Sequence, residues 1–422
     1  MTSYEDRQRL QHLDRAALER HQLVRLNSVL NVILPDNQLY REKLGSDSVQ
    51  LDSLSQLAEL PLTTKSDLED ANGEGWATNR TFALREYSRY HQTSGTAGRP
   101  LIVTDTQDDW QWWIDSWQYV LDAGGITADD VCMMAFSFGP FIGFWSAFDA
   151  VVHRGCLAVP GGGLSTLARL ERMKTARATC LFCTPTYAMR LAEVAGEHNF
   201  DLQALDVRTL IVAGEPGGSL AAVRARLESA WDAQVLDHSG ATEIGPWGYG
   251  TFDGHGLFVN EAEFIAEFLD PETQQPASPR EVAELILTTL GRSGCPVIRY
   301  RTGDLVRPRR DHDASFVLLE GGILGRADDM MIIRGVNIFP SSIEEIVRNF
   351  PEIGEYRLTA FRAGTMDGIR LEIEDGQGVL KRLAEEVRVQ LGLNIEVASV
   401  PRDSLPRFEA KSRRFVDRRQ EP

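Results

Sequence analysis

Cysteine is scarce in this 422-residue sequence, and its acidic residues outnumber the basic ones. The cysteines are an odd set of five, which does not form a secreted disulfide framework in a chain of this length. Lys and Arg number 44 against 61 Asp and Glu, which gives a formal net charge of -17. Binding to a nucleic-acid backbone depends on a basic surplus that releases counterions, so this charge argues against a nucleic-acid partner.

Long apolar runs are also missing. No stretch approaches the ~20 apolar residues that cross a bilayer. The N-terminus, MTSYEDRQRL, lacks the apolar segment of a signal peptide. We therefore expect no membrane association and a cytoplasmic location.

Two of the cysteines, Cys180 and Cys183, form a CxxC pair. The pair lies in ATCLFCTPTY, an apolar run that is typical of a strand. We interpret both residues as small buried hydrophobic groups. A redox-active or metal-binding pair is the alternative interpretation.

The sequence is that of a folded protein with more than one domain. Hydrophobic residues make up 43% and charged residues 25%, which is ordinary for a globular chain. Apolar residues at helical spacing over 5–33 predict amphipathic helices, and Thr64-Lys65-Ser66-Asp67 resembles a capping box. The length exceeds what one hydrophobic core usually supports.

Short apolar runs alternate with helix-length segments between residues 131 and 240. This alternation predicts βαβ units and a mostly parallel sheet flanked by helices, which is an α/β fold. Ligands of such sheets gather beyond the carboxyl ends of the strands. The glycine-bearing turns AGEPGG (213–218) and DHSGATEIG (237–245) are expected there.

A second, smaller α+β domain is expected at the C-terminus. Residues 250–325 are richer in strands and turns, and a helix is predicted after them, with Ser341 as its cap and Glu344 three residues on. We place a large domain at 1–327 and a small, mobile domain at 328–422.

The segment 91–101, HQTSGTAGRPL, has the make-up of a phosphate-binding loop. Its hydroxyl and guanidinium groups can donate to phosphate oxygens, and its glycines let backbone N–H groups converge. The candidate residues are Thr93, Ser94, Gly95, Thr96, Gly98 and Arg99. It is not a Walker A loop, because the GxxxxGK[ST] spacing is absent. A plain turn is the alternative.

Further motifs follow in order. SGATE (239–243) places the hydroxyl of Thr242 and the carboxylate of Glu243 at a strand end, as a phosphate and Mg²⁺ site needs. YRTGDL (300–305) places Asp304 where a carboxylate can accept two ribose hydroxyls. The remaining candidates are Arg326, the doublet Asp328-Asp329 at the predicted domain junction, and Lys411 near the C-terminus.

This ordered set resembles the adenylate-forming superfamily of acyl-CoA synthetases, nonribosomal adenylation domains and firefly luciferase. It is most similar to the phenylacetate–CoA ligase branch, and LPLTTKSDL and TPTYAMRLAE are also similar to that branch. The resemblance covers nearly the whole chain, from residue 91 to Lys411. Five motifs in one order are far more specific than any single motif.

The resemblance implies an ATP site. The loop at 93–99 would wrap the β- and γ-phosphates, with Arg99 where Lys is frequent. Thr242 would contact the α-phosphate, and Glu243 would hold Mg²⁺. The other implied nucleotide-binding residues are Gly214, Glu215 and Pro216 along adenine, Ser239 and Gly240 beside them, and Asp304 with Arg326 at the ribose.

The resemblance also implies a moving domain. Lys411 would neutralise charge on the α-phosphate and the carboxylate during adenylation. Asp328 would be the hinge at which the small domain swings, so that the face bearing Gly335 and Val336 arrives for thioester formation.

Simpler interpretations of these residues stay open. Asp304 can cap a turn, and Glu243 can be a solvated carboxylate at a helix start. Lys411 can belong to a solvated basic tail, because several arginines occur between 407 and 414.

The acid is expected beside the adenine slot. Aromatic residues are dense in FSFGPFIGFW (136–145), so an aryl or arylacetic acid is the expected substrate. The candidate pocket residues are Phe136, Phe141, Tyr187, His238 and Gly240. A plain aromatic core is the alternative, and His238 can be a structural histidine. Trp110, Trp113 and Trp117 follow helical spacing and are interpreted as core.

Together these features predict an ATP-dependent acid–thiol ligase that forms an acyl-CoA through an acyl-AMP. Its expected cofactors are ATP, Mg²⁺ and coenzyme A. Alternatives are an enzyme that loads a carrier-protein thiol and a non-catalytic sensor of a nucleotide or acyl-adenylate. The family also implies a homodimer through the N-terminal helices. No structural zinc is expected, because His255 and Cys295 are too few ligands.

Overall fold

The computed structural model of the chain describes residues 2–69, 75–93, 100–310, 315–327, 331–333, 336–363, 366–374, 378–391, 393, 395–408 and 414–419. Its α-helices are α1 (Tyr4–Gln11), α2 (Arg15–Ile33), α3 (Gln38–Leu44), α4 (Lys65–Leu68), α5 (Gln107–Ala123), α6 (Ile142–Arg154), α7 (Thr166–Ala176), α8 (Pro185–Glu197), α9 (Ala221–Trp231), α10 (Pro340–Arg348) and α11 (Leu380–Leu391). Short 3₁₀ helices occur at Leu54–Glu59 and Leu84–Glu86.

The largest sheet has, in spatial order, β10 (Phe264–Leu269), β11 (Ala283–Thr289), β12 (Tyr300–Arg309), β13 (Leu318–Arg326), β9 (Gly256–Val259), β8 (Gly245–Gly250), β7 (Gln234–Ala241), β6 (Thr209–Ala213), β5 (Cys180–Cys183), β3 (Val131–Met134) and β4 (Leu157–Pro160). The smaller sheets are β1 (Tyr87–Gln92) with β2 (Ile102–Thr106), β14 (Met331–Ile333) with β15 (Val336–Ile338), and β18 (Glu396–Val400), β17 (Met366–Glu374), β16 (Tyr356–Ala363) and β19 (Phe415–Asp417).

The strands from β7 to β4 pair in parallel and are joined by helices, as the alternating pattern over 131–240 predicts. All four residues of β5 are buried, because helices cover both faces of a parallel sheet. The sheet continues antiparallel from β7 to β10, where the sequence is rich in turns. The α/β fold class is therefore confirmed, with a large mixed sheet.

The N-terminal predictions are confirmed as well. Helices α1 and α2 occupy the segment with helical spacing, and Thr64 caps α4 in a capping box with Asp67. Helix α5 buries the three tryptophans that follow helical spacing: Trp110, Trp113 and Trp117 are at most 5% exposed. They lie in the core, as their spacing predicts.

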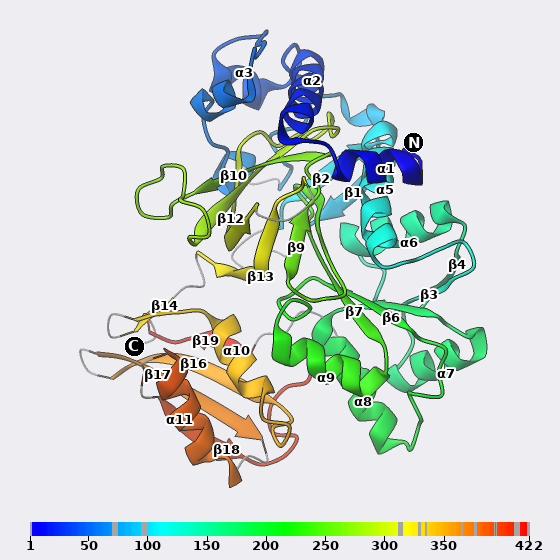
Figure 1. Ribbon diagram of the computed structural model, residues 1–422, viewed down its shortest axis with the longest axis vertical. Coiled ribbons are helices and arrows are strands. Elements are labelled where there is room, and N and C mark those ends of the chain that lie inside the picture. The colour runs from blue at the N-terminus through cyan, green and yellow to red at the C-terminus, as the bar shows by residue number, and fades with distance from the viewer. Residues whose placement is uncertain are drawn as a thin grey trace.

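The small domain at the C-terminus has its own core between the β16–β19 sheet and helices α10 and α11. Figure 1 shows it as a separate lobe beside α8 and α9 of the large body. The predicted cap of α10 is wrong. The helix begins at Pro340 after Phe339, and the Ser341 hydroxyl donates to the Leu324 carbonyl instead. Proline pre-sets the φ angle of a first helical residue, and the helix begins at Pro340, two residues earlier than a cap at Ser341 would give.

All five cysteines are buried and unpaired. Cys180 and Cys183 occupy β5, as small apolar residues would, and burial raises the pKa of the Cys183 thiol. Within the part of the chain that the structure describes, no helix combines the length and the apolar character needed to cross a membrane.

Candidate active site

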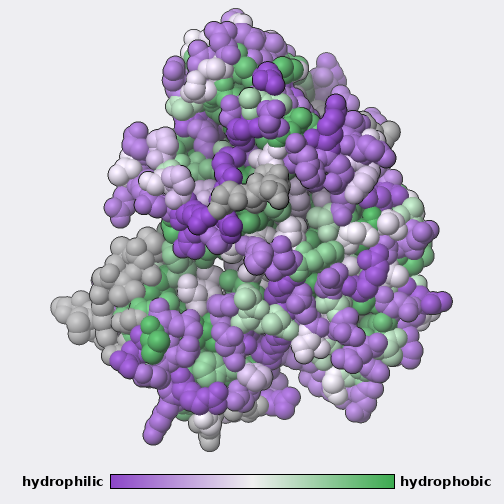
Figure 2. Space-filling view, viewed as in Figure 1, coloured by the Kyte–Doolittle hydropathy of each residue, from purple (hydrophilic) through white to green (hydrophobic). Residues whose placement is uncertain are grey.

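Two of the predicted site segments, AGEPGG and SGATE, follow neighbouring strands of the largest sheet. The turn after β6 and the end of β7 are neighbours, because the two strands pair in parallel up to Ala213 and His238. Figure 2 shows the surface hollowed between the large body and the small domain. The carboxyl ends of β6 and β7 therefore carry the two glycine-bearing turns together, as predicted.

The predicted phosphate loop connects the strands of the β1–β2 hairpin. Gln92 pairs with Ile102 in that hairpin. The Thr93 hydroxyl accepts a hydrogen bond from the backbone N–H of Leu101 at 3.0 Å, and the Thr93 N–H donates to the Leu101 carbonyl at 3.0 Å. Thr93 thus closes the base of the loop. Ser94, Gly95, Thr96, Gly98 and Arg99 lie outside the described residues.

A buried ion pair supports the turn that carries the SGATE motif. Arg292 is fully buried, and its guanidinium contacts Asp105 of β2 at 2.7 Å. Its Nη1 donates to the backbone carbonyl of Thr242 at 3.0 Å, and it lies over the Trp113 ring. Arg292 therefore ties the strand that follows the phosphate loop to the turn between β7 and β8.

Glu243 follows Thr242 in this turn and is partly buried. Its Oε1 accepts a hydrogen bond from the hydroxyl of Tyr300 on β12 at 3.1 Å. Burial and the neighbouring carboxylate raise the pKa of Tyr300, so the phenol stays protonated and donates. A side chain held in this way is not a free, solvated carboxylate.

Ser239 and Gly240 occupy the end of β7. A Cβ on Gly240 would lie 2.9 Å from the carbonyl oxygen of Gly245, so the sharp approach of β8 requires glycine there. Gly214, Glu215 and Pro216 form the neighbouring turn after β6. The Glu215 Oε1 accepts the backbone N–H of Thr186 at 2.8 Å, which fixes the turn against the N-terminus of α8.

Asp304 and Arg326 lie side by side on β12 and β13, because they pair in register. The Arg326 Nη1 lies 3.4 Å from Asp304 Oδ1 and donates to the Thr302 carbonyl at 3.2 Å. Gly303, which lies between Thr302 and Asp304 in the chain, has a φ of +75°, and the Arg326 Nη2 lies 2.9 Å from where a Cβ on Gly303 would be. The Thr-Gly-Asp turn thus presents a carboxylate beside a cation.

His238 precedes the SGATE turn and is buried against Trp117, with ring centroids 4.2 Å apart. Its Nδ1 lies 2.7 Å from the Gly248 carbonyl oxygen. Burial lowers the pKa of His238 to about 4, so the neutral ring donates through Nδ1. The adjacent Asp237 accepts from the Ser219 hydroxyl, and burial raises its pKa to about 6.

The aromatic segment 136–145 forms one cluster. Phe136 and Phe144 stack at 4.3 Å, and Phe136 meets Phe138 edge to face at 5.7 Å. Phe141 is 37% exposed at the N-terminus of α6. Tyr187 is buried in a separate core cluster, where its hydroxyl donates to Thr166 at 3.2 Å. The roles of Phe136, Phe141 and Tyr187 in acid binding stay predictions.

Lys411, Asp328 and Gly335 lie outside the described residues, and Val336 begins β15. Among the described residues near Lys411, Arg407 and Arg414 do not form a solvated tail. Arg414 is 6% exposed and paired with Glu355, and Arg407 is paired with Glu374 at 2.7 Å. The C-terminal segment is therefore anchored at both of its described ends.

Several contacts between the large body and the small domain were not predicted from the sequence. The Glu345 carboxylate on α10 accepts the backbone N–H of Ala222 at 3.0 Å, at the first turn of α9. Leu220, the N-cap of α9, offers no side-chain acceptor, so Glu345 replaces the missing cap. Arg226 of α9 donates to the Ile353 carbonyl at 3.2 Å. No local sequence signal marks such pairs.

Comparison with known proteins identifies the family. Residues 36–290 match the family described as AMP-binding enzyme, and residues 335–419 match the AMP-binding enzyme C-terminal domain. The chain belongs to the AMP-binding enzyme family. The predicted resemblance to adenylate-forming enzymes is confirmed. The predicted domain boundary after residue 327 stays a prediction, as do the roles of the individual site residues.

This AMP-binding enzyme is similar to phenylacetate-coenzyme A ligases along nearly its whole length. It is 30% identical to the ligase of Pseudomonas putida over 425 residues, 96% of this chain and 94% of that protein. It is 30% identical to the ligase of Escherichia coli (strain K12) over 429 residues, 95% of each chain.

The fold is also similar to crystal structures of 2-hydroxyisobutyryl-CoA ligase. In the postadenylation state, in complex with R3-HIB-AMP, that ligase matches with a TM-score of 0.92 at 26% identity. In the thioesterification state, with 2-HIB-AMP and CoA, it matches with a TM-score of 0.74 at 27% identity. Both matches cover 100% of this chain and 94% of the ligase chain.

Proposed function

We propose that the chain is an AMP-forming acid–CoA ligase, which activates a carboxylic acid with ATP and passes the acyl group to coenzyme A. The observation that carries the proposal is the meeting of three predicted site segments: AGEPGG and SGATE follow neighbouring parallel strands, and Tyr300 of YRTGDL donates to Glu243 of SGATE. They meet in a chain that matches both domains of the AMP-binding enzymes. The similarity to phenylacetate-coenzyme A ligases supports the same reaction.

In the first half-reaction, a carboxylate oxygen of the acid attacks the α-phosphorus of ATP, and pyrophosphate leaves. Thr242 donates its hydroxyl to the α-phosphate, and the loop that Thr93 closes holds the β- and γ-phosphates. Asp304 accepts the ribose hydroxyls, with Arg326 keeping its carboxylate in place. Lys411 neutralises charge that develops on the α-phosphate. Catalysis of this kind consists mainly of positioning and charge stabilisation.

The residues at the β7–β8 turn fit Mg²⁺. The turn offers a hydroxyl at Thr242 and a carboxylate at Glu243, and oxygen donors of this kind are the ligands that the ion prefers. Mg²⁺ is commonly held by one or two carboxylates together with substrate phosphates, so one glutamate suffices. When bound, the ion would neutralise phosphate charge. Tyr300 orients Glu243 through its hydroxyl.

In the second half-reaction, the thiol sulfur of coenzyme A attacks the carbonyl carbon of the acyl-AMP, and AMP leaves with both electrons of the broken C–O bond. Rotation of the small domain at Asp328 removes Lys411 and brings the face with Gly335 and Val336 to the site. A large reorientation of this type is compatible with the lower TM-score against the thioesterification state of the related ligase.

We propose an aryl or arylacetic acid as the substrate. The cluster around Phe136 and Phe144 lies just after β3, whose carboxyl end belongs to the same parallel half of the sheet as β6 and β7. Aromatic pairs contribute ~0.5–1.5 kcal/mol beyond the area they bury, so a ring on the substrate would be favoured there. Neutral His238 adds no charge to that environment.

The test is a panel of aryl, arylacetic and short aliphatic acids with ATP and Mg²⁺, with and without coenzyme A. Pyrophosphate release and acyl-CoA formation are measured together. The proposal expects release that depends on an aromatic acid and an acyl-CoA of matching mass. Pyrophosphate release without acyl-CoA formation would favour a carrier-protein thiol as the acyl acceptor. Binding of ATP without release for any acid would favour a sensor.

Two further expectations about the chain stay predictions. A homodimer through α1 and α2 would double the mass measured by light scattering in solution. A cytoplasmic location is checked by fractionating cells of the source organism.

A further inference from the structure

A polar chain crosses from the small domain to the predicted adenine turn. The Arg414 Nη1 donates to the hydroxyl of Thr186 on α8 at 3.0 Å. The backbone N–H of the same Thr186 donates to Glu215 Oε1 at 2.8 Å. Arg414 and Thr186 are 228 residues apart in the sequence, and both are at least nine-tenths buried. Thr186 thus contacts the nucleotide turn and the small domain at once.

The Arg414 guanidinium is also bound by residues of its own domain. Arg414 Nη2 donates to Glu355 Oε2 at 3.0 Å, and the guanidinium lies over the ring of Tyr356 and over that of Phe408. The Arg414 carbonyl accepts the Leu358 N–H at 2.8 Å, at the start of the pairing between β16 and β19. Arg414 therefore keeps its position within the small domain whether or not Thr186 is present.

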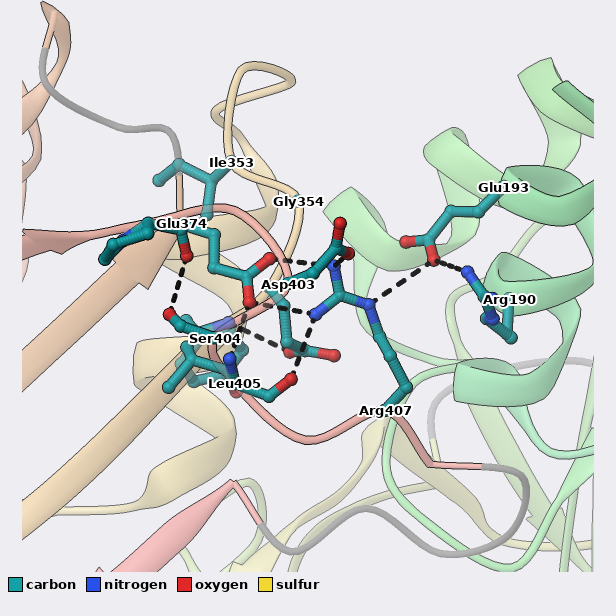
Figure 3. Close-up of polar contacts among 12 residues, drawn as sticks. Arg190, Glu193, Ile353, Gly354, Glu374, Asp403, Ser404, Leu405 and Arg407 are labelled. Carbon is teal, nitrogen blue, oxygen red and sulfur yellow. Dashed lines mark hydrogen bonds and ion pairs between the residues drawn. The ribbon is translucent and has the colours of Figure 1, made fainter. Parts of the chain in front are cut away.

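The other end of the same segment contacts the same helix. Arg407 donates to Glu374 in the small domain, and its Nε lies 3.8 Å from Glu193 Oε2 on α8 (Figure 3). Thr186 and Glu193 are seven residues apart, which is two helical turns, so they lie on one face of α8. Residues 407 and 414 flank Lys411 in the sequence. One face of α8 thus meets the described residues on both sides of the lysine.

These contacts are observed in one domain orientation. The chain matches the postadenylation state of 2-hydroxyisobutyryl-CoA ligase, in complex with R3-HIB-AMP, at a TM-score of 0.92 and its thioesterification state at 0.74. The contacts between α8 and the described C-terminal residues are therefore those of an orientation closer to the state that holds the acyl-AMP than to the state that also holds CoA.

We propose that Thr186 is a positioning residue for adenylation. Its hydroxyl holds Arg414, which lies three residues after Lys411 in the sequence, against α8 while the acyl-AMP forms, and Glu193 assists through Arg407. This inference rests on the proposed function. Thr186 acts through Arg414 and takes no part in the second half-reaction, in which the small domain has turned away.

The experiment separates the two half-reactions for Thr186→Val and Thr186→Ser. Adenylation is followed as acid-dependent exchange of pyrophosphate into ATP, and thioester formation as acyl-CoA produced from purified acyl-AMP and coenzyme A. We expect Thr186→Val to slow adenylation by about tenfold, because it loses a hydrogen bond to a charged group. Thioester formation should stay within about twofold, and Thr186→Ser should restore adenylation.

A matched pair of variants tests the contact between Glu193 and Arg407. Glu193 and Glu197 are both on α8 and both contact Arg190, at 3.1 and 3.2 Å, but Glu193 also faces Arg407. We expect Glu193→Gln to slow adenylation by about two- to threefold and Glu197→Gln to leave it unchanged. Equal effects of the two substitutions would show that Glu193 acts only by stabilising α8, and not through Arg407.

The inference is overturned if Thr186→Val leaves adenylation unchanged, or lowers both half-reactions alike, which a merely structural role would do. Failure of Thr186→Ser to restore adenylation would also contradict it. Thermal unfolding of each variant identifies a folding defect. If the wild-type protein performs neither half-reaction with any acid, the proposed function fails, which is a different outcome.

Discussion

Asp304 and Arg326 face each other across two antiparallel strands, with Arg326 Nη1 3.4 Å from Asp304 Oδ1. The Asp304 side chain is only 16% exposed, and the backbone turn before it is fixed by Gly303. A carboxylate held in this manner has two oxygens for the two hydroxyls of a ribose. Its position is set before the nucleotide arrives.

Replacing this carboxylate should weaken ATP binding. We expect Asp304→Asn to raise the Kd for ATP by roughly thirtyfold, or about 2 kcal/mol, because hydrogen bonds to a charged acceptor are lost. Calorimetric titration with ATP measures this. Asp270→Asn is the control, since Asp270 bonds to Thr273 within an exposed turn. An unchanged Kd for Asp304→Asn would remove Asp304 from the nucleotide site.

Glu243 should set the requirement for magnesium. In Glu243→Gln, the Mg²⁺ concentration for half-maximal pyrophosphate release should rise by about tenfold or more, because a charged ligand is lost. Tyr300→Phe removes only the hydroxyl that orients Glu243, so a shift of about two- to fivefold is expected. If both variants keep the wild-type magnesium curve, Glu243 does not hold the ion.

Lys411 should serve only the first half-reaction. Lys411→Ala should lower adenylation by about a hundredfold or more, because the charge that stabilises the transition state is lost. Thioester formation from supplied acyl-AMP should stay close to the wild-type rate. Arg382→Ala, which removes an exposed cation of α11 in the same domain, is the control for lost positive charge. Wild-type adenylation in Lys411→Ala would exclude the lysine from catalysis.

His238 should make the large domain sensitive to acid. Its pKa is lowered from 6.5 to about 4, so the unfolded chain binds the proton more readily than the folded one. Its contribution to the free energy of unfolding is complete above pH 6.5 and is lost as the pH falls towards 4. The loss amounts to about 3 kcal/mol.

Asp237 acts in the opposite direction over an overlapping range, because its pKa is raised from 3.8 to about 6. The measurement therefore compares the wild type with His238→Asn. Both proteins contain Asp237, so its contribution is the same in the two curves. Denaturant unfolding between pH 4 and 7 should show the advantage of the wild type shrinking as the pH falls. Parallel curves would show that His238 is not buried as a neutral ring.

The parallel half of the sheet could be predicted because its signals are local. Apolar runs such as TCLFC and helix-length segments such as STLARLERMKTA differ in period, and their alternation over 131–240 fixes the βαβ class. The same holds for the capping box at Thr64, which needs four consecutive residues. The same alternation placed AGEPGG and SGATE at the carboxyl ends of strands, where the structure has them.

Other features depend on residues far apart in the chain. Strand β1, with the sequence YSRYHQ, has little apolar content and forms because it pairs with β2 across the predicted phosphate loop. The contact of Arg414 with Thr186 and that of Glu345 with Ala222 join the two domains. From the sequence alone a solvated basic tail stayed open as an alternative for the segment around Lys411, because the partners of Arg414 lie far away in the chain.

Attack of the acid's carboxylate on the α-phosphorus of ATP is tested most directly by isotope transfer. The acid that releases most pyrophosphate is prepared with oxygen-18 in its carboxylate and incubated with ATP, Mg²⁺ and coenzyme A. Mass spectrometry then follows the label. One labelled oxygen in the phosphate group of AMP is the predicted result, because the bridging oxygen stays with phosphorus when the thiol displaces AMP. Unlabelled AMP, or label in inorganic phosphate, would contradict an acyl-AMP intermediate.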